Sequence, residues 1–205
     1  MNRRSSALLL VFTALALLLI GCEPPWAVVQ QTTPNPFANQ RRFAVAPTDF
    51  SVLRVGSKSE AEYLAGKDEK QQLSFQTDKA AANEELTRAL IGHAHSAGVE
   101  IVLATGPTDG PFVIRPAMIF FEPGFYAGVI ASPSRLDVSV KITMPDGTVL
   151  DEILMSHRTA APTMNNNLLG AMINIDKMSS GGRLRADAEW IGKTGGKYLM
   201  TRVVP

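Results

Sequence analysis

The strongest constraint on the fold is the alternation of apolar and polar residues in the stretch "LDVSVKITM", residues 136–144. A period of two over this length indicates a β-strand with one buried face. Pro145-Asp146-Gly147 follows it and fits a type I turn with glycine in the left-handed position. Residues 136–157 are therefore predicted to form a β-hairpin.

The register of this hairpin raises a question about one carboxylate. If Met144 pairs with Thr148, Glu152 falls opposite Val140, on the face that the core requires. Either a β-bulge turns Glu152 outward, or Glu152 is a partly buried carboxylate. The bulge is the favoured of the two interpretations.

Other segments predict regular structure on both sides of the hairpin. They are strands in 41–47, 99–105 and 112–121, a helix in 78–98 capped by Asp78, and a terminal helix in 181–203 weakened by Gly195-Gly196. Pro116 predicts an irregularity within its strand. The order of elements predicts an α/β (α+β) fold, with a small mixed β-sheet and two main helices packed on one face.

The first 22 residues have the layout of a secretory signal: a basic start, 14 uncharged residues, then Gly21-Cys22. Fourteen helical residues rise only about 21 Å, which is short of a hydrocarbon core of roughly 30 Å. A cleaved signal is therefore favoured over a permanent transmembrane span.

The stretch Leu19-Ile20-Gly21-Cys22 resembles the lipobox of bacterial lipoproteins. The resemblance implies cleavage between Gly21 and Cys22, and attachment of acyl chains to Cys22 that bind the chain to a lipid bilayer. Glu23 then implies the outer membrane, with the domain facing the periplasm; display on the cell surface is left open. A cleaved signal with an unmodified thiol is the alternative. Cys22 is the sole cysteine, so an intramolecular disulfide is excluded.

Three regions follow along the chain. Residues 1–21 are the predicted signal peptide, 22–40 a lipidated and flexible tether, and 41–205 a single periplasmic α/β domain. The tether is predicted because "EPPWAVVQQTTPNPFANQ" is rich in Pro, Gln, Asn and Thr and lacks a helical or strand period.

The pattern of elements from 41 to 202 resembles the periplasmic α/β domains of bacterial lipoproteins, such as the curli-secretion lipoprotein, and the amino-terminal domain of TolB. The similar features are "LTRALIGHAHSAGVEIVLA", the hairpin, and the closing "RLRADAEWIGKTGGKYL". The resemblance implies a role in building or supporting envelope assemblies, and it brings no catalytic motif.

Charge argues against one class of partner. The whole chain carries a net charge of +1, which becomes −1 when the signal with Arg3 and Arg4 is removed. A nearly neutral protein lacks the basic surface of a nucleic-acid binder. No nucleic-acid partner is therefore predicted.

Motifs for catalysis or metal binding are weak. His93 and His95 point about 200° apart on a helix and would need His157 to bind one metal. Ser156 and His157 are adjacent on a strand and face opposite ways. The stretch "SSGGR", 179–183, suits either a helix cap or an anion site. No catalytic residue, no metal and no cofactor are predicted.

Aromatic residues flank the Glu122-Pro123-Gly124 turn. Phe120, Phe121, Phe125 and Tyr126 suit either core packing or a partner surface. If they form a partner surface, Phe125 and Tyr126 are its residues, with Tyr126 exposed.

The predicted function is that of a non-enzymatic, membrane-anchored lipoprotein of the bacterial envelope. It binds or supports other envelope components, either a protein partner or further copies of itself. The alternative is a lipoprotein that recognises a small ligand in a pocket near the loops "GPTDGP" and "FEPGFYAG". An envelope hydrolase is a less favoured third hypothesis.

Overall fold

The protein is seen in a computed structural model that describes residues 24–106, 109–127, 130–160 and 180–204. Its main sheet is mixed and eight-stranded, with the order β1-β10-β9-β6-β2-β5, and β3 and β4 lie off this path. The strands are β1 (Ala27–Gln31), β2 (Arg42–Val45), β3 (Arg54–Val55), β4 (Lys58–Ser59), β5 (Glu100–Leu103), β6 (Val113–Glu122), β9 (Arg135–Thr143) and β10 (Val149–His157). A separate hairpin joins β7 (Phe125–Ala127) to β8 (Ile130–Ser132).

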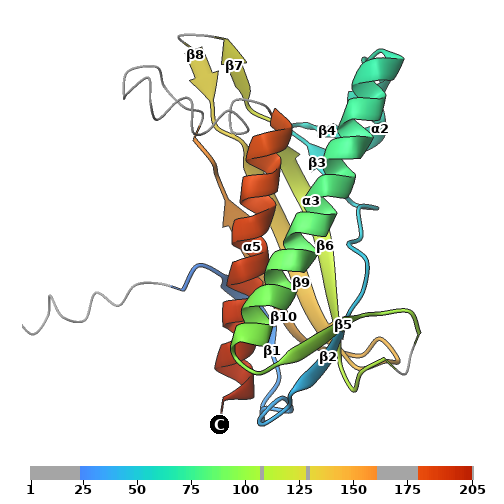
Figure 1. Ribbon diagram of the computed structural model, residues 1–205. Coiled ribbons are helices and arrows are strands. Elements are labelled where there is room, and N and C mark those ends of the chain that lie inside the picture. Colours follow the sequence, from blue (N-terminus) through green and yellow to red (C-terminus); the bar gives the residue numbers. More distant parts are fainter. Residues whose placement is uncertain (1–23, 107–108, 128–129, 161–179, 205) are drawn as a thin grey trace, which may run out of the picture.

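Two long helices, α3 (Glu69–Ser96) and α5 (Ser180–Val203), lie side by side across one face of the sheet (Figure 1). A short helix, α2 (Glu60–Ala65), precedes α3. This arrangement confirms the predicted α/β class with two main helices on one face. Among the described residues, no helix has the length and apolar character needed to span a membrane.

The alternating strand supplies the centre of the core. Leu136, Val138, Val140 and Ile142 are all buried in β9, beneath buried residues of both long helices. The helix residues in this core include Leu86, Leu90, Leu184, Ala188, Ile191 and Leu199. Burial of these side chains is what the period of two in the sequence predicted.

The predicted bulge in the hairpin is confirmed. The register between β9 and β10 shifts between Val149 and Asp151. Glu152 lies opposite Lys141, and its carboxylate accepts a hydrogen bond of 2.7 Å from the Ser139 hydroxyl. The shift leaves Asp151 with no exposed surface. The buried carboxylate is thus Asp151, the neighbour of the residue that the sequence singled out.

Helix α3 begins earlier than predicted. Its cap is Asp68, whose carboxylate accepts the Gln71 N–H at 2.8 Å, and Gln71 reaches back to the Asp68 N–H. The prediction of Asp78 as the cap is wrong, because the polar residues before it form the first turns of the same helix. The helix ends where Gly98 takes a φ of +74°, as expected for a glycine after a helix.

The expected irregularity at Pro116 is displaced along the strand. Pro116 pairs in register with Val140, and the register shift falls between Met118 and Phe120. On its other side the carbonyl of Pro116 accepts the Asp49 N–H at 2.9 Å, beyond the end of β2. Since no strand ladder requires an N–H there, the proline fits without a break.

The predicted tether is wrong for the described part of residues 22–40. Residues 27–31 form β1, which pairs antiparallel with β10 at the edge of the sheet. Phe37 is fully buried against Phe43 and Phe112. All five residues of β1 are exposed, so the strand carries no apolar alternation that the sequence could reveal. The signal peptide and Cys22 lie outside the described residues.

A buried cluster around Asp151 holds this amino-terminal segment in place. The carboxylate accepts hydrogen bonds from the Tyr198 hydroxyl at 2.6 Å, from Arg202 Nε at 2.7 Å and from the Thr32 N–H at 2.9 Å. Arg202 also donates to the Thr32 carbonyl at 2.9 Å. The cluster therefore joins the segment after β1, the hairpin and the end of α5.

Glycines in α5 allow the two long helices to approach each other closely. A Cβ atom at Gly192 would lie 2.3 Å from the Leu86 carbonyl oxygen, and one at Gly196 would lie 2.9 Å from the His93 side chain. Glycine in a helix costs stability locally, but here it permits contact between the helix backbones. Gly192 and Gly196 are therefore required by the packing of α5, whereas a Cβ atom at Gly195 would make ordinary contacts at 3.6 Å.

The close approach predicts opposite effects for two matched substitutions. Gly192→Ala is expected to lower the free energy of unfolding by roughly 1–3 kcal/mol, because backbone atoms of α3 must move. Gly92→Ala is the control, since a Cβ atom at Gly92 would meet nothing within 4 Å. It should stabilise the helix by roughly 0.5–1 kcal/mol. Urea titration of both variants measures the difference, and equal effects would contradict the packing described here.

The Asp151 cluster predicts a dependence of stability on alkaline pH. Burial, helped by the hydrogen bond to Asp151, raises the pKa of Tyr198 above its ordinary value. Below about pH 10 both the folded and the unfolded chain keep this proton, whereas above it only the unfolded chain loses it. The free energy of unfolding should therefore fall as the pH rises above 10. Tyr198→Phe should make this fall shallower in urea titrations than it is in the wild-type protein; an unchanged slope in Tyr198→Phe would contradict the assignment.

Candidate functional site

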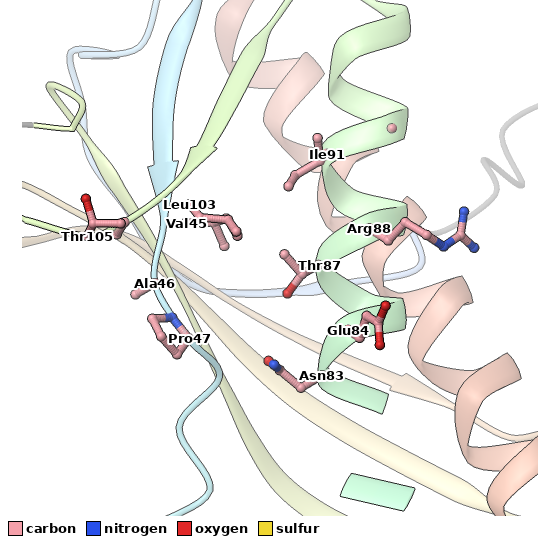
Figure 2. A pocket seen from close by; sticks show the side chains of 12 residues that line it. Val45, Ala46, Pro47, Asn83, Glu84, Thr87, Arg88, Ile91, Leu103 and Thr105 are labelled. Carbon is pink, nitrogen blue, oxygen red and sulfur yellow. The ribbon is translucent and has the colours of Figure 1, made fainter. Parts of the chain in front are cut away.

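An apolar groove of about 840 Å³ lies between α3 and the ends of β2 and β5. Figure 2 shows Val45, Leu103 and Ile91 around the gap between strand and helix. The hollow exists because β2 and β5 run parallel and end beside the middle of α3, so the helix covers only part of their carboxyl ends. We call it the α3–β5 groove.

Strand β5 forms the outer edge of the sheet among the described residues. The N–H groups of Glu100 and Ala104 donate to carbonyls on the β2 side, each at 2.8 Å. Since alternate residues of a strand point opposite ways, the backbone groups of Ile101 and Leu103 point away from the sheet. The Leu103 side chain is 63% exposed at this edge. The groove therefore combines apolar side chains with an edge strand.

Polar side chains on the groove do not converge on a common point. The Asn83 amide oxygen accepts the Thr48 N–H at 3.2 Å, and Arg88 pairs with Glu85. The Arg88 guanidinium points away from the strands in Figure 2. This pattern differs from a small-molecule pocket, in which a few polar groups fix the ligand's orientation.

The carboxylate of Asp109 binds the backbone just after β5, at one end of the groove. Asp109 accepts backbone N–H groups from Gly106, at 2.6 Å, and from Thr105. These two bonds, in that order, hold the pKa of Asp109 below its ordinary value. The α3–β5 groove thus lies beside the "GPTDGP" loop, where a pocket was predicted. The carboxylate of Asp109 in this loop already accepts hydrogen bonds from the loop backbone.

A second polar cluster surrounds the buried carboxylate of Asp187 in α5. It accepts from the Ser134 hydroxyl at 2.6 Å and the Thr159 hydroxyl at 2.6 Å, and lies 2.7 Å from His157 Nδ1. A hydrolytic triad needs the histidine between the serine and the carboxylate. Here the buried serine bonds directly to the carboxylate, so the cluster joins α5 to the sheet.

Ser156 and His157 face opposite ways, as predicted from the sequence. The Ser156 hydroxyl donates to Asp137 at 2.6 Å, whereas His157 bonds Asp187 and stacks on Trp190 with ring centroids 4.4 Å apart. Side chains of the two residues therefore engage different partners, as expected for neighbours on a strand.

The histidines of α3 have different surroundings. His93 is partly buried against Gly196 of α5, and His95 is exposed. Within the described part of the chain, no three His, Cys, Asp or Glu side chains gather in a way that could hold a metal ion. The three-histidine arrangement suggested by the sequence is not formed, because His157 is engaged with Asp187.

The "SSGGR" stretch begins α5, but the anion beside it belongs to the chain itself. A Cβ atom at Gly181 would lie 2.1 Å from the Asp78 carboxylate, so that carboxylate lies at the first turn of the helix. Burial raises the pKa of Asp78. The position suggested for an external anion is next to this carboxylate, which disfavours a second negative charge.

The remaining predicted site residues are placed only in part. Gly21 and Cys22 lie outside the described residues. Phe121 belongs to the core. The guanidinium carbon of Arg135 lies 5.1 Å from the centroid of the Phe120 ring. Phe125 and Tyr126 lie on β7, and their side chains are outside what the structure describes. A small hollow of about 250 Å³ adjoins Phe120 and Glu122, near the second predicted loop.

The groove itself was missed by sequence reasoning. Its lining comes from the end of β2, the middle of α3 and the end of β5, which together span about 60 residues of chain. No local signal marks it, because the exposure of Leu103 at the end of "VEIVL" is seen only in the structure.

Comparison with known proteins gives weak likenesses. The chain matches no protein-family model and no curated protein sequence. The solved structures that resemble it include the PelC dodecamer from Paraburkholderia phytofirmans, with 9% identity, a TM-score of 0.44 and coverage of 82% of this chain and 97% of that one. The hypothetical protein CT253 from Chlamydia trachomatis has 14% identity and a TM-score of 0.44, covering 79% and 99%. A minor lipoprotein from Acinetobacter baumannii has 10% identity and a TM-score of 0.39, covering 78% and 94%. With TM-scores below 0.5, these likenesses carry no conclusion about function.

Proposed function

We propose that this protein is a lipid-anchored, non-enzymatic component of the bacterial envelope that binds another envelope protein through the α3–β5 groove. The observation that carries the binding role is the exposed apolar Leu103 beside the outward-facing backbone of β5. The anchor is the acylated Cys22, and the outer membrane is the proposed membrane, with the domain in the periplasm.

The lipid anchor is supported by the sequence alone. A basic start, a run of 14 uncharged residues and Leu19-Ile20-Gly21-Cys22 occur in the order that lipoprotein processing requires. Several acyl chains on one residue hold a protein firmly, whereas a single chain binds only marginally.

The proposed occupant of the groove is an extended segment of the partner. The outward-facing N–H and C=O groups of Ile101 and Leu103 can pair with an added strand, and the partner's apolar side chains can then fill the groove. Edge strands of this kind are a common route to association. The β7–β8 hairpin, with Phe125 and Tyr126, is a proposed second contact surface.

A small apolar ligand is the second candidate for the groove. It is favoured by one observation: the groove lies at the carboxyl ends of the parallel strands β2 and β5, where α/β sheets often bind ligands. Against it, Asn83 and Arg88 already have partners within the chain. A hydrolase is not proposed, since the Asp187 cluster joins serine directly to carboxylate.

Site-specific photo-crosslinking in the native bacterium tests the proposal. A photoreactive amino acid is placed at position 103 or, as the control, at position 73 of the full-length protein. Leu73 is a matched control, because it is an exposed leucine like Leu103, with 69% of its surface exposed. It lies on α3, about 15 Å along the helix axis from the residues of α3 that line the groove. A discrete protein adduct is expected at 103 and not at 73.

The controls separate the two parts of the proposal. Cys22→Ser should move the protein from the membrane fraction to the soluble periplasmic fraction, and failure to do so contradicts the anchor. Ile91→Arg, which places a charge in the groove, should abolish the adduct at 103 while the protein stays folded by circular dichroism. Equal labelling at 103 and 73 contradicts the groove as a protein-binding site. An adduct of small mass at 103 would favour the ligand alternative.

A further inference from the structure

A second hollow, of about 540 Å³, lies at the opposite edge of the sheet from the α3–β5 groove. Residues 24–27, the far half of β10 and α5 contribute to its lining. Both tryptophans of the sequence, Trp26 and Trp190, line it, together with Pro25 and Leu154. We call it the tryptophan hollow.

Contacts with the folded core hold both indole rings in place. Trp26 meets the buried Tyr198 edge to face, with ring centroids 5.6 Å apart. Trp190 stacks on His157, with the ring centroids 4.4 Å apart. Each ring keeps part of its surface exposed. The hollow is therefore a fixed part of the fold, although one wall comes from residues expected to be a loose tether.

Covalent geometry limits the distance between the lipid attachment site and Trp26. Cys22 precedes Trp26 by four residues, and an extended chain spans at most about 3.5 Å per residue. The two Cα atoms are thus no more than about 14 Å apart. One polar layer of a bilayer is about 5–8 Å thick, so an acylated Cys22 leaves little room between the membrane and Trp26.

We infer that the domain lies directly against the bilayer, with the tryptophan hollow facing the lipid. This inference rests on the lipid anchor proposed above. It assigns a membrane-binding role to a surface of the domain itself, in addition to the acyl chains. The domain thereby takes a defined orientation on the membrane.

The chemistry of this surface suits the polar–apolar boundary of a membrane. Tryptophan rings favour that boundary, because they combine a large apolar face with one N–H donor. Leu154, which lines the hollow, is partly exposed, and Val28 and Val29 are exposed on β1, which follows Trp26.

Charges at the rim of the hollow neutralise each other. Arg135 pairs with Asp137 at 2.7 Å, and the Ser156 hydroxyl donates to the same carboxylate at 2.6 Å. A paired, hydrogen-bonded rim costs less to bring near lipid than an isolated charge does. The rim is therefore compatible with contact with a bilayer.

Tryptophan fluorescence tests the inference directly, because both tryptophans of the chain lie at the proposed contact. The full-length, acylated protein is reconstituted into phosphatidylcholine vesicles with or without brominated acyl chains, which quench nearby indoles. Trp26→Phe and Trp190→Phe report each ring separately. Each remaining tryptophan is expected to lose roughly half or more of its emission in brominated vesicles.

Two further variants separate the surface from the anchor. A long Gly-Ser linker between Glu23 and Pro24 combined with Leu154→Glu should abolish most of the quenching, because both the restraint and the apolar contact are weakened. The same linker combined with Leu73→Glu, a change at an exposed residue of α3 that does not line the hollow, should keep more of the quenching. Circular dichroism checks that each variant is folded.

The outcomes distinguish this inference from the lipid anchor. Protein that does not float with the vesicles contradicts the anchor. Protein that floats but has unquenched tryptophans, open to the soluble quencher acrylamide, overturns the membrane-facing hollow and leaves the anchor standing. Tryptophans shielded from both quenchers would show that a protein surface, such as a second copy, covers the hollow, and would also overturn the inference.

Discussion

The buried carboxylate of Asp151 is the interaction on which the arrangement of this protein depends. It receives hydrogen bonds from Thr32, Tyr198 and Arg202, and so joins the amino-terminal segment, the hairpin and the last turns of α5. Removing one partner of a buried ion pair costs about 3–5 kcal/mol, because the other charge stays buried without compensation. The cluster therefore fixes the path of the chain just after β1. Because that path is fixed, the chain that carries the proposed lipid anchor enters the domain at one defined position, next to β1.

The order of strands then separates two surfaces. β1, next to the tryptophan hollow, and β5, beside the α3–β5 groove, are the two ends of the main path β1-β10-β9-β6-β2-β5. Five strand spacings place these edges about 24 Å apart. The proposed membrane contact and the proposed partner contact can therefore be made at the same time. A domain held close to the bilayer at one edge presents the other edge to a partner, without the long tether that the sequence predicted.

Local sequence patterns predicted the parts of the fold that depend on interactions between residues close together in the chain. The hairpin was predicted because Leu136, Val138 and Val140 alternate with polar residues, and the bulge followed from the position of Glu152. Strand β1 was missed because it is exposed on both faces, so its backbone pairing leaves no apolar pattern. Gly195-Gly196 suggested a weak helix, since the close packing of α3 against Gly192 and Gly196 is not visible in the sequence. The groove and the tryptophan hollow join residues far apart in the chain, and their formation depends on tertiary packing.

Amide hydrogen exchange of the mature protein, read by mass spectrometry over residues 26–40, tests the central claim most directly. If the Asp151 cluster and the pairing with β10 hold this segment, its amides after Ala27 should exchange far more slowly than those of an unstructured peptide. Protection should also fall in Asp151→Asn, while the centre of β9 stays protected. Exchange of residues 27–32 at the rate of an unstructured chain in the wild-type protein would contradict the account, because the domain would then hang from a tether and lie free of the membrane.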